Sequence, residues 1–344
     1  MRFTSDNTAS VSAEILDAML AVNQGRAPAY SDDRWSKRLD QAFAEFFDAP
    51  VRVFTVATGT AANSLALAAV TPPHGAIFTH EEAHVVRDEC SAPEFFSGGA
   101  RLILLPGAHG KLTLDALGNA LKSNPPTVHT VQPCALTLTQ ATESGTVYQI
   151  DEIAALADFA HRHALAVHMD GARFANALVT LGCHPADATW RAGVDVLSFG
   201  ATKNGALSAE AVIFFDLERV RDFELRRKRG GHLLSKSRYA SVQLLAYLES
   251  GLWRRNAERT NTLASRIGAA AAGHLLHPVE GNEVFVHLGD SAIRLLRLAG
   301  FEFYDWGAEG SGHARFVVSW DQPEEDVGAL CTALSAPDRL ITPP

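Results

Sequence analysis

Short apolar runs of β type alternate with Ala- and Leu-rich stretches between about residues 50 and 215. The runs are VRVFTV, AIFTH, RLILLP, TVHTVQP, LAVHMD, VDVLSF and AVIFFD. Between them, apolar positions recur with the helical period, most clearly over 60–70 and 151–165, each behind a capping or turn residue. Such alternation is typical of a largely parallel sheet with helices on both faces. We therefore expect an α/β fold here.

The pattern changes beyond about residue 245. A long Ala-rich helix is expected around 253–275, and a second helix near 290–299. Short strands are expected in NEVFVHL, FEFYDW and ARFVVSW. This mixture indicates a smaller α+β unit. We predict an N-terminal arm over 1–25, a large domain over 26–245 and a small C-terminal domain over 246–344.

Composition narrows the classes of function. The chain has 344 residues, 47% of them hydrophobic, which is enough for an extensive core. Its 30 basic and 39 acidic residues are spread without long single-sign runs, which argues against nucleic acid and membrane surfaces as partners. No apolar stretch approaches the roughly 20 residues of a membrane helix, and the N-terminus lacks a signal-peptide core. We expect a cytoplasmic protein that binds small molecules.

The four cysteines add no site. Cys90, Cys134, Cys183 and Cys331 are far apart and form no CxxC pair. This spacing predicts neither a disulfide framework nor a zinc site, and it fits a reducing compartment. His161 and His163 form an HxH inside a predicted helix, where residues two apart face different sides. We therefore expect no metal site.

Two polar residues stand just past the carboxyl ends of predicted strands: Asp170 in LAVHMDGAR and Lys203 in VDVLSFGATKNG. Ligands bind at this edge of an open α/β sheet. A lysine amine can form an imine with pyridoxal 5′-phosphate (PLP), and a carboxylate can keep the pyridine nitrogen of PLP protonated. Asp170 and Lys203 suit these roles. Taken alone, Asp170 more often indicates a helix cap or turn former, and Lys203 equally fits a solvated loop residue.

A candidate phosphate site precedes both residues. In VATGTAANSLALAA, Thr58, Gly59 and Thr60 form a short turn that opens a helix, and free N–H groups there favour an anion. Gly59 permits close approach of a phosphate. Such a short motif often only connects a strand to a helix. The order of turn, acid and lysine, each at a strand end, favours a PLP site.

The chain resembles the low-specificity L-threonine aldolases, which include the phenylserine aldolases. These are PLP enzymes of fold type I, the aspartate-aminotransferase-like fold. The resemblance spans nearly the whole chain. It rests on SDN near the start and on AYSDDRW, TGTAANSLALA, HEEAHVVRDECSAPEFF, LTQATESGTVY, HMDGARFANAL, WRAGVDVLSFGATKNG and GHARFVVSWD. The resemblance implies that Lys203 forms the Schiff base, Asp170 pairs with the pyridine nitrogen, and Gly59 and Thr60 hold the phosphate.

The resemblance also implies roles for residues whose local sequence is uninformative. His84 would stack on the cofactor ring, and Arg173 would lie beside a PLP oxygen. The local sequence alone favours a half-buried core histidine for His84 and leaves a helix-face arginine as the alternative for Arg173. Many family members carry a second active-site histidine where this chain has Glu143 in QATESG. The base that takes the β-hydroxyl proton is therefore open between His84, with an ordinary pKa of about 6.5, and Glu143. A solvated loop carboxylate is the alternative for Glu143.

A further group of residues is expected around the substrate. An arginine fork suits the carboxylate of an amino acid, and the resemblance points to Arg315 in GHARFVVSW, with Ser5 in the arm adding a hydrogen bond. Tyr30 and Asp88 resemble family positions near the β-substituent. On local sequence, Arg315 equally fits a surface strand residue.

The basic run ELRRKRGGHLLSK favours a solvated face or a subunit contact over nucleic acid. The resemblance implies a homodimer or homotetramer with shared active sites. Lys228, or alternatively Lys236, would then approach the phosphate bound to a neighbouring subunit.

The expected reaction is retro-aldol cleavage of L-threonine, L-allo-threonine and related L-β-hydroxy-α-amino acids, such as phenylserine, to glycine and an aldehyde. Two alternatives remain at this stage. One is another PLP-dependent β-eliminating lyase. The other is a non-catalytic protein that only binds PLP or a nucleotide in an α/β fold.

Overall fold

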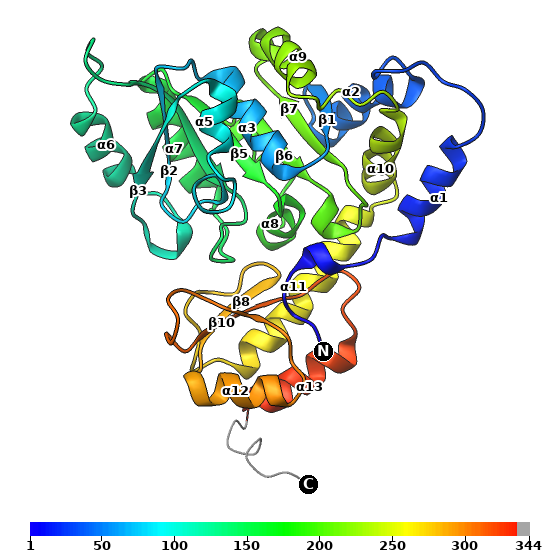
Figure 1. The fold of residues 1–344 in the computed structure, drawn as a ribbon, viewed down its shortest axis with the longest axis vertical. Helices are drawn as coiled ribbons and strands as arrows, with labels where there is room; N and C mark the ends of the chain where they lie inside the picture. Colours follow the sequence, from blue (N-terminus) through cyan, green and yellow to red (C-terminus); the bar gives the residue numbers. More distant parts are fainter. Residues whose placement is uncertain (336–344) are drawn as a thin grey trace.

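The computed structural model describes residues 1–335. Its centre is a seven-stranded sheet with the order β1-β7-β6-β5-β4-β2-β3 (Figure 1). Neighbouring strands run parallel except at β7, which is antiparallel to both β1 and β6. The prediction of a mostly parallel α/β sheet is confirmed. The strands are β1 (Arg52–Val56), β2 (Gly75–His80), β3 (Arg101–Leu105), β4 (Gln132–Thr139), β5 (Ala166–Gly171), β6 (Val196–Gly200) and β7 (Glu210–Phe214).

One predicted strand was wrong in position. The β-branched run TVHTVQP predicts a strand over 127–133, but β4 begins only at Gln132. Residues before it form a turn in which the Thr127 N–H donates to Thr130 Oγ1 at 3.0 Å. Val128 is 95% exposed there. The β-branched side chains of this run therefore had no sheet to pack against, and the strand lies downstream in QPCALTLT.

Helices cover both faces of the sheet, as expected. On one face, alternate strand residues such as Phe54 and Ile77 pack with α3 (Gly59–Val70), α5 (Ala92–Ser97) and α9 (Val220–Arg229). The larger apolar cluster on the other face is completed by α1 (Ala13–Val22), α2 (Arg34–Phe47), α6 (Leu114–Ser123), α7 (Ile150–Arg162), α8 (Phe174–Leu181) and α10 (Arg238–Glu249). The predicted helix over 151–165 ends early because Ala164 adopts a positive φ of 56° at the turn into β5.

A second, three-stranded sheet has the order β8-β10-β9. Its strands are β8 (Glu283–His287), β9 (Tyr304–Asp305) and β10 (His313–Val317), and its helices are α11 (Leu252–Ala270), α12 (Asp290–Leu298) and α13 (Glu324–Ser335). The N-terminus belongs to this core: Phe3 is fully buried in it, and the Val317 N–H donates to the Phe3 carbonyl at 2.9 Å. Residues 336–344, the end of the predicted C-terminal domain, lie outside the described residues.

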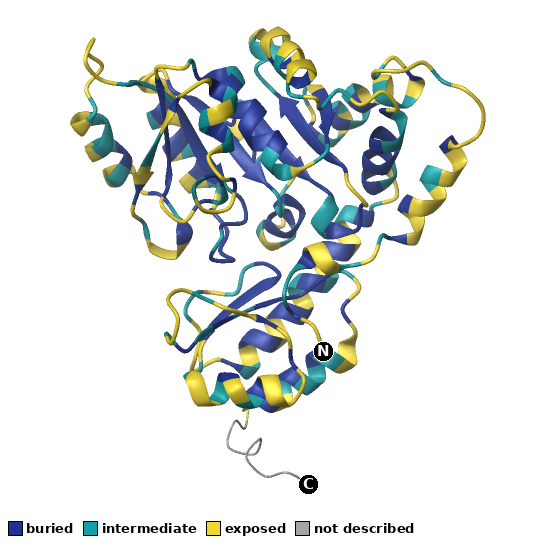
Figure 2. Ribbon diagram, in the orientation of Figure 1, coloured by how far each residue is buried: buried dark blue, intermediate teal, exposed yellow. Residues whose placement is uncertain are grey.

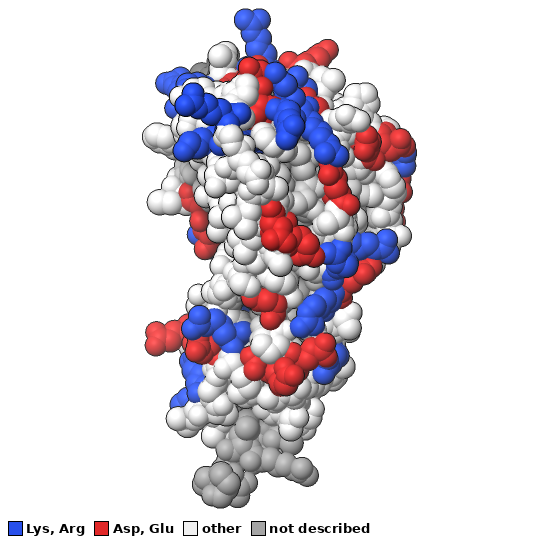
Figure 3. Space-filling model, turned by 90° about the vertical axis from the view of Figure 1, so that its right-hand side faces the viewer, with Lys and Arg blue, Asp and Glu red and all other residues white. Residues whose placement is uncertain are grey.

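The surface carries mixed charge. Figure 2 shows buried residues concentrated in the central strands and on the inner sides of the helices. On the face drawn in Figure 3, Lys and Arg side chains gather toward the upper end, where α9 lies in Figure 1, and acidic side chains are interspersed below. Within residues 1–335, no helix combines the length and the apolar character needed to cross a bilayer.

Candidate functional site

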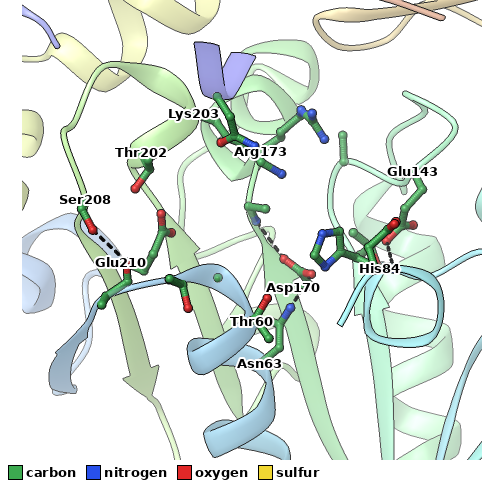
Figure 4. Close-up of a pocket in the computed structure, with 18 residues that line it drawn as sticks. Thr60, Asn63, His84, Glu143, Asp170, Arg173, Thr202, Lys203, Ser208 and Glu210 are labelled. Atoms are coloured by element: carbon green, nitrogen blue, oxygen red, sulfur yellow. Dashed lines mark hydrogen bonds between the residues drawn. The ribbon is translucent and has the colours of Figure 1, made fainter. Parts of the chain in front are cut away.

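A pocket of about 420 Å³ lies at the carboxyl ends of the parallel strands (Figure 4). Most of the predicted site residues line it, although they come from segments far apart in the sequence. The predicted residues in its lining are Thr58, Gly59, Thr60, His84, Asp88, Glu143, Asp170, Arg173 and Lys203. Further polar side chains in the lining were not predicted from the sequence. They are Asn7, Asn63, Thr139, Thr202, Ser208 and Glu210.

Asp170 is fixed near the end of β5. It is 3% exposed. Its Oδ2 accepts a hydrogen bond from Asn63 Nδ2 at 2.7 Å, and its Oδ1 accepts one from the Ala172 N–H at 3.0 Å. These donors replace the hydrogen bonds to water that a buried carboxylate loses. Because Asn63 stands on α3, the same helix that begins with the glycine turn also orients the aspartate.

Lys203 lies on a short 3-10 turn, Thr202–Asn204, directly after β6. The turn is anchored by the buried Asn204, whose Nδ2 donates to the Tyr247 hydroxyl at 2.6 Å and to the Trp253 carbonyl at 2.8 Å. Asn256 holds the Asn204 carbonyl from α11 at 2.9 Å. The backbone that carries Lys203 is therefore held in place from two helices.

The glycine turn has the geometry of an anion site. Thr58 caps α3, with its Oγ1 accepting from the Ala61 N–H at 3.1 Å. The helical bonds begin with the Ala62 N–H to the Thr58 carbonyl, so the N–H groups of Gly59 and Thr60 precede them. A Cβ built on Gly59 meets no atom within 4 Å among the described residues. The first turn of α3 is thus open toward the pocket and suited to a phosphate.

The half-exposed His84 belongs to a hydrogen-bond chain whose other members are buried. Its Nδ1 lies 2.8 Å from Glu89 Oε1, which also accepts from Asn63 Nδ2 at 2.8 Å. Because Asn63 also binds Asp170, the chain connects the histidine to the aspartate. The hydrogen bond to Glu89 raises the pKa of His84 above its ordinary value, and burial raises the pKa of Glu89. Ligand-type atoms of His84, Glu89 and Asp170 lie within 4.8 Å of one another, but the Asn63 amide donates to both carboxylates.

Glu143 stands beside His84 in the loop after β4. Its Oε1 accepts the His84 backbone N–H at 2.7 Å. Its Oε2 is buried and has no hydrogen-bond partner among residues 1–335. Burial, with a contribution from Asp170, raises the pKa of Glu143 to about 7. The side chain is therefore not the solvated loop carboxylate that was the alternative, and it is poised to exchange a proton near neutral pH.

Arg173 connects the pocket to the arm and to the second sheet. Its Nε and Nη2 donate to the two carboxylate oxygens of Asp6 at 2.8 and 3.1 Å. Its Nη1 lies 3.2 Å from Glu283 Oε2. Burial opposes the charged form, but Asp6 and Glu283 raise the pKa of Arg173 above its ordinary value. The guanidinium is therefore permanently charged and already paired.

Arg315 lies on β10, outside the residues that line the pocket. Its Nη1 lies 3.8 Å from Glu283 Oε1, so Glu283 stands between Arg315 and Arg173. Its Nη2 donates to the Thr4 carbonyl at 3.3 Å. Ser5 is also outside the lining, and its Oγ accepts the N–H of Asn7. The arm reaches the pocket through Asn7 instead.

Tyr30 and the two lysines of the basic run are also outside the pocket lining. Tyr30 is 53% exposed, and Lys228 Nζ lies 4.6 Å from the centre of its ring. Lys236 is exposed as well. These side chains lie away from the pocket of their own chain. The roles that the sequence suggested for them stay predictions.

The residues that sequence reasoning missed share one property: each depends on a contact across elements. Asn63 lies one helical turn after the glycine turn, and Glu89 lies five residues after His84. The hydrogen bonds from Asn63 to Asp170 and to Glu89 are visible only in the fold. His161 and His163 make unrelated contacts, to Asp195 and to the Phe159 carbonyl.

Comparisons with known proteins agree on one family. Residues 2–291 match the family described as beta-eliminating lyase. The low specificity L-threonine aldolase of Pseudomonas aeruginosa is 43% identical over 334 residues, which are 96% of this chain and 95% of that protein.

Solved structures agree in fold. A Leishmania major threonine aldolase superposes with a TM-score of 0.92 at 24% identity, covering 99% of each chain. An aspartate aminotransferase from Rhodobacter sphaeroides gives 0.73 at 16% identity, covering 98% of this chain and 93% of its own. The predicted fold type I is therefore confirmed. The chain belongs to the beta-eliminating lyase family, whose threonine aldolases are PLP-dependent lyases.

Proposed function

We propose that this protein cleaves the Cα–Cβ bond of L-threonine, L-allo-threonine and related L-β-hydroxy-α-amino acids to give glycine and an aldehyde, with PLP as its cofactor. The observation that carries the proposal is the convergence of Asp170, Lys203 and the Thr58–Thr60 turn on one pocket. Its relatives in the same family support the reaction class.

The residues fit the cofactor. Lys203 supplies the amine that would hold the aldehyde carbon, and the open first turn of α3 would receive the phosphate. Asp170 supplies a buried, donor-held carboxylate for the pyridine nitrogen. When bound, PLP accepts the electron pair that remains on Cα when the Cα–Cβ bond breaks.

We assign proton transfer to the side of the pocket that is formed by His84 and Glu143. Cleavage requires removal of the proton from the β-hydroxyl of the substrate. Glu143 is the candidate with an unpartnered buried oxygen and a pKa near 7. The ring of His84, whose Nδ1 is bound to Glu89, is the other candidate. Asp88, which also lines the pocket, lies on the same segment as His84 and is the candidate for contact with the β-substituent.

The substrate carboxylate needs a cation. We retain Arg315 for this role, with Ser5 beside it on the arm. In the structure Arg315 contacts Glu283 at 3.8 Å, longer than the Arg173–Glu283 contact at 3.2 Å. Its Nε is buried without a hydrogen-bond partner among the described residues, so a planar carboxylate would satisfy a group that is otherwise unmatched.

We further propose that two or four copies assemble and share sites. Tyr30 and Lys228 pack on each other on the outside of their own chain. A role beside a bound phosphate therefore requires the pocket of a second copy. The predicted division into a large and a small domain is supported by the separate apolar cores of the two sheets, whereas the predicted arm contributes Ile15 to one core and Phe3 to the other. The four free cysteines support a cytoplasmic location.

The test is direct product analysis. Purified protein with added PLP is given L-threonine, L-allo-threonine and L-phenylserine, and glycine and aldehyde are measured. Release of glycine in step with the aldehyde supports the proposal. Release of ammonia and an oxo acid instead would identify another β-eliminating lyase, and no product from any amino acid would leave only a PLP-binding protein.

A further inference from the structure

Glu210 occupies its place because β7 is antiparallel. The parallel strands β1 and β6 end at the pocket, whereas β7 begins there, with Glu210 as its first residue. In the ladder, Glu210 pairs with Val56 of β1 on one side and with Gly200 of β6 on the other. The glycine turn follows β1 and Lys203 follows β6. The carboxyl of Glu210 is thus held between the phosphate turn and the lysine (Figure 4).

The surroundings of Glu210 offer one cation and no salt bridge among the described residues. It is 7% exposed. Thr202 hydrogen-bonds its carboxyl, and the charged or titratable groups that act on it are Lys203 and Asp170, with Tyr247 of α10 on a third side. On the side of the glycine turn, Thr58, Gly59 and Thr60 carry no charge. Burial raises the pKa of Glu210 to about 7.

A phosphate dianion bound at the glycine turn would change the protonation equilibrium of the Glu210 carboxyl. Two like charges in a shared buried site raise the pKa of the weaker acid, because the site resists holding both. A carboxylate at this position opposes phosphate binding, whereas a neutral carboxyl can donate a hydrogen bond to a phosphate oxygen. Lys203 is the one cation that acts on Glu210 among the described residues, and it lowers the pKa of the carboxyl, but burial outweighs it.

We propose that Glu210 is the proton-carrying group of the phosphate subsite, taking up a proton when a phosphate group binds beside it. This inference rests on the proposed function, because it assumes that PLP is the phosphate carrier. It makes cofactor loading dependent on pH through a residue that takes no part in the cleavage itself. At pH 8 the free carboxyl is ionised and binding takes up nearly one proton. At pH 6 the carboxyl is already protonated and binding takes up almost none.

The experiment counts protons on binding. Full-length protein freed of cofactor is titrated with PLP and with pyridoxal, which lacks the phosphate, by calorimetry at pH 8 in two buffers of different ionisation enthalpy. Subtraction of the pyridoxal value isolates the proton linked to the phosphate group. We expect this difference to fall by nearly one proton in Glu210→Gln. We also expect the wild-type Kd for PLP, relative to that of Glu210→Gln, to rise about tenfold per pH unit above 7.

Glu143→Gln is the matched control, because it removes the other buried glutamate with a pKa near 7 at the opposite end of the pocket. It should leave the phosphate-linked proton count unchanged. The inference is overturned if wild-type protein takes up the same number of protons with PLP and pyridoxal, even if Glu210→Gln does not fold. It is also overturned if Glu210→Gln changes the two counts equally, which assigns the proton to Lys203. Failure of PLP to bind at all would instead refute the proposed function.

Discussion

The two ends of the pocket are built in different ways. At the cofactor end, Asp170 lies within β5 and Lys203 follows the adjacent strand β6, so hydrogen-bonded backbone sets their spacing. At the opposite end, His84 begins a four-residue helix and Glu143 stands in a loop. Their relation depends on the 2.7 Å bond from the His84 N–H and on Glu89. The cofactor end is therefore set by the sheet, and the proton-transfer end by side-chain hydrogen bonds.

The largest effect is expected at the cofactor end. Lys203→Ala removes the amine that would hold the cofactor, and kcat for L-threonine should fall by about a thousandfold or more. The absorbance band of lysine-bound PLP should disappear. Lys122→Ala, at an exposed position of α6, should keep both activity and spectrum. A band that persists in Lys203→Ala without added amine would refute the assignment of Lys203.

Asp170→Asn tests the same end with less damage. The amide keeps the size of the side chain but carries no charge to hold a protonated pyridine nitrogen, so kcat should fall about a hundredfold. PLP should still bind, as judged by absorbance. Asp115→Asn on α6 is exposed and serves as the control. A kcat within twofold of wild type would show that the reaction does not need the charge of Asp170.

Glu143→Gln tests the proton-transfer end. If Glu143 takes the β-hydroxyl proton, it acts as the ionised carboxylate, so wild-type kcat/KM should rise with pH through about 7 and then level. The variant should lose this rise with pH, and its kcat/KM should be about a hundredfold lower than that of wild type at pH 8. The exposed Glu325→Gln on α13 should leave the profile unchanged. An unaltered pH limb would assign the base to His84.

The smallest effect is expected from Glu89→Gln. The Glu89 hydrogen bond is the largest cause of the raised pKa of His84, so the variant should lower that pKa and reduce kcat about tenfold. NMR titration of the ring would measure the pKa shift, and a dispersed spectrum would show that the variant is folded, since unfolding also returns the ring to its ordinary pKa. The exposed Glu82→Gln, near the same helix, is the control. An unchanged His84 pKa would show that the Glu89–His84 contact carries no proton coupling.

Much of the cofactor end was predictable because strand ends are visible in a sequence. LAVHMD and VDVLSF became β5 and β6, and parallel strands bring their carboxyl ends to one edge. The strand predicted from TVHTVQP was wrong in position, because β-branched composition alone does not show whether a neighbouring strand will be present. Glu89 and Asn63 gave no local signal, since each matters only through a partner on another element.

The sequence by itself determined the parallel sheet, the order of turn, acid and lysine, and the family, because these depend on local periodicity and on contiguous motifs. Only the tertiary structure decided which charges meet. It reversed β7 and so brought Glu210 between the phosphate turn and Lys203. It also joined Arg173 and Arg315 through Glu283. The physical reason is that burial and charge pairing act between side chains far apart in the chain, and both set protonation at the site.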